Sequence, residues 1–275
     1  MSFGRLLKRS FEGKESLEDV INRQLKLRPT YSFEAVKKAA KSLSDYTEEE
    51  DMDKDVFQKK FFSLWLAMFA EHDRSAKVIH PSSFRNDCLR QLYYQFTDAE
   101  ESDVVTKKIS GGLQRIFDMG TWIHVYIQVL LWQAGVLEEA EAVVRSRKKR
   151  IGGRTDGIIK WEGERMVLEI KSIGSRGYPT IITKPKDDHE YQASVYASEL
   201  GISKICYLYF NKDTAEIKIH IRPTHAAHVK NANEKIEELN YSIAKKVAPT
   251  KICRDFKSEA AKTCPFKTLC LTKKK

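Results

Sequence analysis

The sequence from Gly152 to Ser172 reads GGRTDGIIKWEGERMVLEIKS, and this stretch decides how the chain folds. Two runs within it, 158–161 and 166–170, have the apolar and β-branched composition of strands. The residues between them, 162–165, suit a tight turn because they are polar and include a glycine. The stretch therefore predicts a β-hairpin.

Three charged residues gather on this predicted hairpin. Asp156 lies at the start of the first strand, and Glu169 and Lys171 lie on the second. Since side chains alternate between the two faces of a strand, Glu169 and Lys171 should point to the same face. Carboxylate oxygens are ligands for Mg²⁺ or Mn²⁺, and a lysine beside them can position a water or stabilise an anion. A hairpin with an ordinary surface salt bridge fits the same pattern, so both interpretations stay open at this point.

Two predicted helices carry further candidates. The apolar stretch 113–134 is long enough to be one helix, and His124 and Gln128 lie one turn apart on it. After a loop with proline and aspartate, Gln192 and Tyr196 are also one helical turn apart. Taken alone, such a histidine is more often a core residue than a ligand, and a Gln/Tyr pair has little weight.

In their order along the chain, these motifs resemble the RecB-like branch of the PD-(D/E)XK nuclease superfamily. The resemblance covers about residues 81–270 and rests on a helix with a histidine, Gly-x-x-Asp-Gly, Leu-Glu-Ile-Lys-Ser and Gln-Ala-x-x-Tyr. It implies an α/β fold of the restriction-endonuclease-like kind, with a central mixed sheet flanked by helices. It also implies that Mg²⁺ or Mn²⁺ is held by four groups: His124, Asp156, Glu169 and the backbone carbonyl of Ile170. Lys171 would orient the attacking water, and Gln192 and Tyr196 would line the path of the DNA.

Four of the five cysteines extend this resemblance. Cys206 lies in an apolar strand-like run and is expected to be a buried core residue. One cysteine before the nuclease motifs and three after them resemble the iron–sulfur members of the branch, such as the CRISPR-associated RecB-like exonucleases and the AddB nuclease domain. The resemblance implies a 4Fe-4S cluster on four thiolates: Cys88, Cys253, Cys264 and Cys270.

The spacing of these cysteines departs from the family in one respect. The family usually has Cys-x-x-Cys near the C-terminus, but here Ala261 stands at the expected place and Cys253 is the candidate partner. Zinc on four cysteines is the competing interpretation, and thiols without any metal are the simplest one.

The net charge of +10 is typical of a protein that binds a polyanion, although ribosomal or membrane-surface roles would also fit. The run Arg145–Arg150 directly precedes the metal-binding motif, so its cations are expected beside the metal site and in contact with DNA phosphates. A solvated edge strand is the alternative. The candidate DNA-contacting cations are Arg147, Lys148, Lys149 and Arg150.

The order of predicted elements is helix, strands, helix, strands, which is typical of an α/β domain. Residues 1–75 are expected to form a charge-rich helical extension, and residues 76–275 the nuclease domain, with metal-cluster segments at 81–94 and 250–272. No secretory signal is evident, and the longest apolar run, 61–70, is too short to cross a bilayer. We therefore expect a cytoplasmic protein with reduced thiols and no membrane partner.

The sequence thus predicts a Mg²⁺- or Mn²⁺-dependent deoxyribonuclease. An exonuclease on single-stranded ends, acting in DNA repair, recombination or end processing, is the leading hypothesis. A structure-specific endonuclease, a non-cleaving DNA-binding subunit of a larger complex and an assembly protein with a structural metal are the alternatives. A helicase, a recombinase or an integrase is the expected kind of protein partner.

Overall fold

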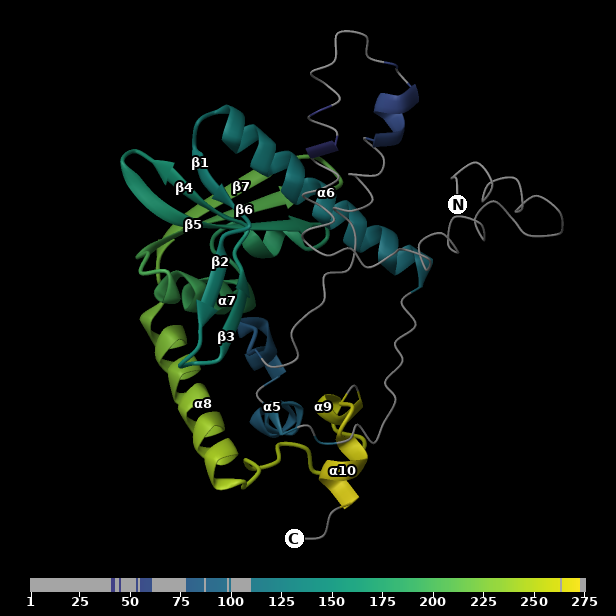
Figure 1. Ribbon diagram of the computed structural model, residues 1–275, viewed down its shortest axis with the longest axis vertical. Coiled ribbons are helices and arrows are strands. Elements are labelled where there is room, and N and C mark those ends of the chain that lie inside the picture. Colours follow the sequence, from purple (N-terminus) through teal and green to yellow (C-terminus); the bar gives the residue numbers. More distant parts are fainter. Residues whose placement is uncertain are drawn as a thin grey trace, which may run out of the picture. The chain divides into compact units, whose positions relative to one another are not determined.

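The structure is a computed structural model that describes residues 41–42, 45, 53, 55–60, 78–86, 88–97, 99, 110–262 and 264–272 (Figure 1). The chain divides into two compact units. The first comprises Met1–Arg74 with Lys108–Thr121, and the second comprises Ser75–Lys107 with Trp122–Lys275. In the first unit, the described residues 41–42, 45, 55–60 and 111–121 are helical, and most of the expected helical extension lies outside the described residues. The second unit holds every candidate site residue.

A five-stranded mixed sheet forms the centre of the second unit. Its strands follow the order β1-β4-β5-β6-β7, with β5 and β6 parallel and all other neighbours antiparallel. The α/β class with a central mixed sheet, predicted from the sequence, is confirmed. The strands are β1 (Leu137–Ala140), β4 (Gly157–Trp161), β5 (Glu164–Ile173), β6 (Lys204–Asn211) and β7 (Ile217–Pro223).

Helices cover both faces of this sheet. On one face, Ile123 and Ile127 of α6 pack against a cluster that includes Ile170 of β5. On the other face, Ala193 of α7 packs against a cluster that includes Val167. The helical elements are η1 (Pro81–Asn86), α5 (Leu89–Phe96), α6 (Gly111–Gln133), η2 (Tyr178–Ile181), α7 (Asp187–Glu199), α8 (Ala226–Lys245), α9 (Glu259–Lys262) and α10 (Lys267–Thr272). None of the described helices is both long enough and apolar enough to cross a membrane.

The predicted hairpin is present as β4 and β5. Trp161 pairs with Glu164, so the connecting turn has only two residues, Glu162 and Gly163. Both have positive φ angles, 51° and 81°, as a type I′ turn requires. The turn is shorter than the four residues expected because a two-residue turn of this type matches the right-handed twist of the strands, and Glu164 and Arg165 extend β5.

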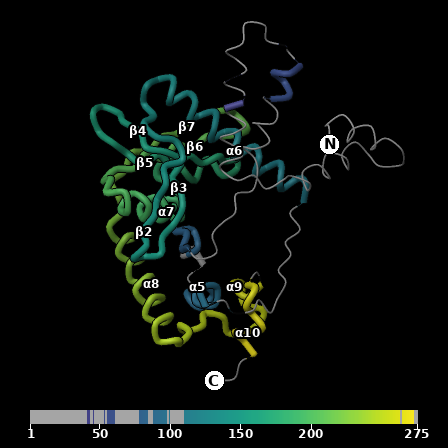
Figure 2. Tube along the Cα trace, in the orientation of Figure 1, coloured from purple at the N-terminus to yellow at the C-terminus, as the bar shows by residue number. Residues whose placement is uncertain are grey.

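A second hairpin stands apart from the main sheet and extends from it toward α8 (Figure 2). It consists of β2 (Val143–Ser146) and β3 (Ile151–Arg154), with residues 147–150 as its turn. Its glycines allow α7 to approach closely, since a Cβ on Gly153 would lie 2.1 Å from the Tyr196 hydroxyl. Residues 147–150 of the basic run therefore lie at the tip of this hairpin, whereas Arg145 and Ser146 belong to β2.

Candidate active site

The turn from β3 into β4 fixes the position of Asp156. The buried Thr155 hydroxyl donates to the carbonyls of Gly157 and Leu168, at 2.8 and 3.1 Å, and accepts from the Gly157 N–H. Position 157 has no room for a side chain, because a Cβ there would lie 2.7 Å from the Glu139 carbonyl. This explains why Asp156 is followed by glycine, because the chain passes tightly between β1 and β5 at position 157.

The carboxylate of Asp156 joins α6 to β5. The pairing of β4 with β5 ends with Gly157 opposite Leu168, and two residues further along β5 the Ile170 N–H donates to Asp156 Oδ2 at 2.5 Å. The other oxygen, Oδ1, lies 3.2 Å from Nδ1 of His124 on α6.

Glu169 and Lys171 form the second half of the cluster. Their side chains lie on the same face of β5, as the strand period predicts, and Lys171 Nζ forms an ion pair with Glu169 Oε1. Glu169 is only 2 % exposed. Its Oε1 accepts no well-aligned hydrogen bond from any described residue, and the ammonium of Lys171 is the opposite charge that lies against it. The structure thus brings together the four side chains that the sequence singled out.

These groups shift one another's proton affinities. Burial raises the pKa of Glu169 to about 7, with the charge of Asp156 adding to the effect and Lys171 opposing it. Burial alone would raise the pKa of Asp156. The pKa is nevertheless lowered, because the hydrogen bond and charge of His124 and the charge of Lys171 outweigh the effect of burial. Burial alone would lower the pKa values of Lys171 and His124. Both values are raised because the neighbouring carboxylates stabilise the protonated forms.

The donor set fits a divalent cation. Ligands at adjacent corners of an octahedral Mg²⁺ or Mn²⁺ site lie about 3 Å apart, given metal–oxygen distances of about 2.1 Å. The 3.2 Å between His124 Nδ1 and Asp156 Oδ1 matches this spacing. The two carboxylates suit Mg²⁺ or Mn²⁺, and the imidazole adds one nitrogen ligand.

Two further residues support the site and were not assigned a role from the sequence. Gln128 donates from Nε2 to the Asp156 carbonyl at 2.8 Å and to Glu141 Oε1 at 3.0 Å. Burial raises the pKa of Glu141, and the Gln128 hydrogen bond opposes this shift. The spacing of four residues from His124 was the signal for Gln128, whereas the sequence around Glu141 gave none.

The two residues expected beside the DNA differ in exposure. Gln192 is partly exposed on α7. Tyr196 is only 3 % exposed, belongs to a core cluster, and has its hydroxyl directly over Gly153. The expectation that Tyr196 lines the DNA path is therefore corrected: its ring packs α7 against the β2–β3 hairpin, and this buried position leaves almost no surface for a ligand.

The basic run, which was expected beside the metal site, lies at the other end of β3 from Asp156. Its residues 147–150 form the tip of the hairpin, and Arg145 and Ser146 belong to β2. Four strand residues span roughly 13 Å. The tip of the hairpin is near Asp156 in sequence but is separated from it in space, because the residues between them form an extended strand.

Two cations of the run make contacts within the protein. Lys149 Nζ lies 2.5 Å from Glu199 Oε1 of α7, and Arg150 Nε donates to Asn240 Oδ1 of α8 at 3.0 Å. These contacts hold the hairpin tip against both helices. The other two candidate DNA-contacting cations are exposed: Arg147 and Lys148.

A pocket near the C-terminus is lined by the four cysteines that were singled out as cluster ligands: Cys88, Cys253, Cys264 and Cys270. Arg90 of α5 closes this region by donating from Nη1 to the Pro249 carbonyl at 3.0 Å. Ala261, which stands where the family has a cysteine, is buried and lines the same pocket. A loop thus delivers Cys253 to the pocket.

The thiols of this pocket act on one another. Burial raises the pKa of Cys264, and the charges of the other three thiols add to this shift, while a hydrogen bond from the Phe266 backbone opposes it. Four thiols that interact in this way form a donor set that fits a metal ion or an iron–sulfur cluster. The fifth cysteine, Cys206, is buried in β6, where burial raises its pKa to about 11, so its expected core position is confirmed.

No family model and no curated protein matches the chain. Among solved structures, the chain is similar to an alkaline exonuclease (LHK-Exo) from Laribacter hongkongensis at 12% identity and a TM-score of 0.47, covering 62% of this chain and 90% of that one. The structure of LHK-Exo in complex with dAMP gives 14% identity, the same TM-score, and coverage of 62% and 89%.

Proposed function

We propose that this chain is a metal-dependent deoxyribonuclease of the PD-(D/E)XK type. The observation that carries the proposal is the convergence of His124, Asp156, Glu169 and Lys171 at one end of the central sheet. Buried carboxylates are costly unless a cation compensates them, and Glu169 is nearly inaccessible to water. A surface salt bridge, the simpler interpretation, would not include a carboxyl buried this deeply.

Each residue has a distinct role in the proposed reaction. Asp156, Glu169 and His124 would hold Mg²⁺ or Mn²⁺, together with the Ile170 carbonyl. A bound divalent ion supplies Lewis acidity, which lowers the pKa of water and neutralises charge on a phosphate. Lys171, held by Glu169, would orient the attacking water or stabilise the negative charge that develops on the phosphorus centre.

Hydrolysis of single-stranded DNA from its ends is the proposed activity, and a structure-specific endonuclease is the alternative. A non-cleaving DNA-binding subunit would have no use for the buried carboxylates and their lysine. The exposed Arg147 and Lys148 and the partly exposed Gln192 are the proposed contacts for DNA. A helicase, a recombinase or an integrase is the proposed kind of protein partner, in DNA repair or recombination.

A comparison of linear and circular substrates separates the two activities. With Mn²⁺, we expect the protein to degrade end-labelled linear single-stranded DNA and to leave a circular single strand of the same sequence intact. The reason is that an exonuclease needs a free end to begin. Gel electrophoresis of both substrates over time is the measurement. Cutting of the circle would replace the exonuclease proposal by the endonuclease alternative, and no cutting of either substrate would contradict both.

The affinity for Mn²⁺ should depend on pH. Glu169 has a pKa of about 7 in the folded protein without metal, so it holds a proton below that pH and must release it to bind the ion. His124, whose pKa is raised, must do the same. We expect the apparent affinity to fall about tenfold or more for each pH unit below about 7 and to level off above it. Calorimetric titrations at several pH values test this, and equal affinities on both sides of neutrality would contradict it.

We also propose that the four-thiol pocket holds a 4Fe-4S cluster, with zinc as the alternative. The support is the donor set, which brings one cysteine from before α5 together with three from the C-terminal segment. Such a cluster would be structural, because it joins parts of the chain far apart in sequence.

A further inference from the structure

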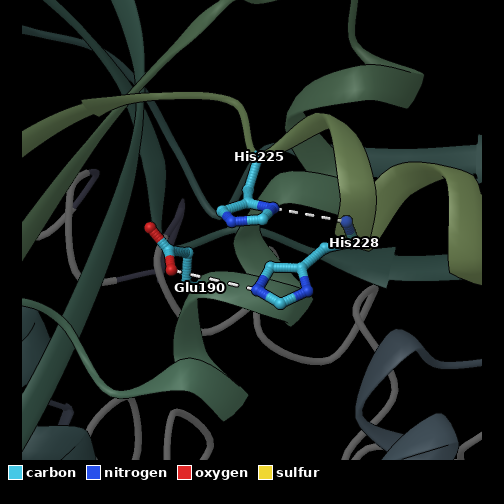
Figure 3. Close-up of side chains that lie close together, drawn as sticks. All are labelled: Glu190, His225 and His228. Carbon is cyan, nitrogen blue, oxygen red and sulfur yellow. Dashed lines mark hydrogen bonds and ion pairs between the residues drawn. The ribbon is translucent and has the colours of Figure 1, made fainter.

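A group of side chains with the chemistry of metal ligands lies between α7 and α8, separate from the candidate active site and from the four-thiol pocket. It consists of Glu190 on α7, His225 at the N-cap of α8 and His228 in the first turn of α8 (Figure 3). One ligand atom from each of the three residues lies within 4.8 Å of the other two. The two helices pack against each other, and this group lies where α8 begins.

The side chains converge on one point. The two imidazole rings are stacked with centroids 4.0 Å apart, and Nε2 of His228 lies 3.8 Å from Oε2 of Glu190. His225 uses Nδ1 to accept from the His228 N–H, at a long 3.4 Å, so its Nε2 is the nitrogen on the side of Glu190 (Figure 3). Four ligands of a tetrahedral zinc ion lie about 3.4 Å apart, given zinc–nitrogen distances of about 2.1 Å. The 3.8 Å between Nε2 of His228 and Oε2 of Glu190 lies close to this value.

The imidazole of His228 has one nitrogen that makes no hydrogen bond within the described part of the chain. Nε2 of His228 is buried and has no hydrogen-bond partner among the described residues. Its closest acidic atom is Oδ1 of Asp187, at 3.4 Å. A buried ring nitrogen without a hydrogen bond is costly, whereas a metal ion would use its lone pair. The negative charges of Glu190 and Asp187 lie on the side that a cation would occupy.

We propose that Glu190, His225 and His228 form a zinc site that fastens the start of α8 to α7. Two imidazoles and one carboxylate are a ligand set that zinc uses in proteins, with a fourth position left for water or for the exposed Asp187. Imidazole ligands favour zinc over magnesium, so this site differs in metal preference from the carboxylate-rich site on β5. When His225 binds the ion through Nε2, its Nδ1 carries the proton and gives up only the long capping contact.

The zinc site also has a structural consequence. α7 carries His189, whose Nδ1 lies 2.9 Å from the Tyr209 hydroxyl, and the charge of Lys171 acts on Tyr209. The metal would therefore fix the helix that packs beside the nuclease residues. It would do so without contributing a ligand to the catalytic ion, and it does not depend on the proposed nuclease activity.

Conservative variants of the full chain test this site. Glu190→Gln removes the anionic ligand at nearly constant size. His225→Asn removes Nε2 but keeps an N-cap acceptor, since asparagine caps helices well. Glu234→Gln is the matched control, because it removes the same charge from an exposed position on α8. Each protein is freed of metal, titrated with zinc chloride in a calorimeter, and analysed for bound zinc and for melting temperature.

We expect the wild type and Glu234→Gln to bind one more tight zinc ion per chain than Glu190→Gln or His225→Asn. Loss of one ligand should weaken this site at least ~10-fold, the lower limit found for losing even an indirect contact to a metal. Zinc should raise the melting temperature of the control more than that of either variant, because a ligand that binds only the folded state stabilises it. Zinc bound by the thiols or by the β5 site remains in all four proteins and cancels in the comparison. Equal zinc content and equal affinity in all four proteins would overturn the proposal.

Discussion

Replacing Asp156 by alanine should lower the rate of DNA cleavage at least ~100-fold, while DNA binding persists. A decrease of this size is typical when one strong electrostatic contact to the transition state is lost. Asp156 is the proposed metal ligand that also joins β5 to α6, through Ile170 and His124. The rate of release of labelled nucleotides with excess Mn²⁺ is the measurement. Glu169→Ala and Lys171→Ala should have effects of similar size, because the two side chains form one ion pair.

Asp156→Asn and an exposed control make this test specific. Asparagine keeps an oxygen that can accept from the Ile170 N–H, so a loss of cleavage in this variant reports on the lost charge rather than on a damaged fold. Glu162→Gln removes a carboxylate from the exposed turn of the same hairpin and should cleave at the wild-type rate. Cleavage by a folded Asp156→Ala protein at the rate of the wild type would refute the catalytic assignment.

The hairpin of the candidate site could be predicted because its determinants are local. Alternating side chains along β5 place Glu169 and Lys171 on one face regardless of the rest of the fold. The partners of Asp156 are a different matter. Its contact with His124 depends on how α6 crosses the sheet, and the sequence supplied that contact only through the resemblance to a family. In the structure, Nδ1 of His124 lies 3.2 Å from Oδ1 of Asp156.

Two expectations differ from the structure because they depended on contacts between distant parts of the chain. The resemblance to a family placed Tyr196 on the DNA path, and the basic run was placed beside the site because it directly precedes Gly152 and Asp156. In the structure, residues 147–150 form the turn of the β2–β3 hairpin, and the Tyr196 hydroxyl lies directly over Gly153 of β3. A run of cations looks like a DNA-binding surface in sequence, but Lys149 and Arg150 pair within the protein. The role of Glu141 could not be predicted, because it depends on Gln128 reaching it from α6.

The three proposed metal sites of this chain differ in ligand chemistry and therefore in the metal that each would prefer. Oxygen-rich Asp156 and Glu169 suit a hard catalytic cation, two imidazoles suit zinc, and thiolates suit iron–sulfur chemistry or zinc. The small helices near the C-terminus, α9 and α10, have four and six residues, too few to be stable alone. A metal in the thiol pocket would give this segment the anchor that its short helices do not provide.

Replacing Cys88 by alanine should therefore remove the colour of the protein and destabilise it. If the four thiols hold a 4Fe-4S cluster, anaerobically purified protein should contain iron and sulfide and absorb broadly near ~400 nm. In the variant this absorbance should be lost and the melting temperature should fall. The reason is that the cluster closes a loop from Cys88 to Cys270, which restricts the unfolded chain.

Cys206→Ala is the matched control, since Cys206 is buried in β6 and lies outside the thiol pocket. It should keep the full absorbance and lose only the stability that comes from core packing. Cys253→Ala tests the departure from the family spacing, and we expect it to lose colour as Cys88→Ala does, because both thiols line the pocket. Full colour in either pocket variant would contradict the proposed ligand set. A colourless wild type with only zinc would replace the cluster by a four-thiolate zinc site, while loss of that zinc in Cys88→Ala would still assign the pocket as the structural metal centre.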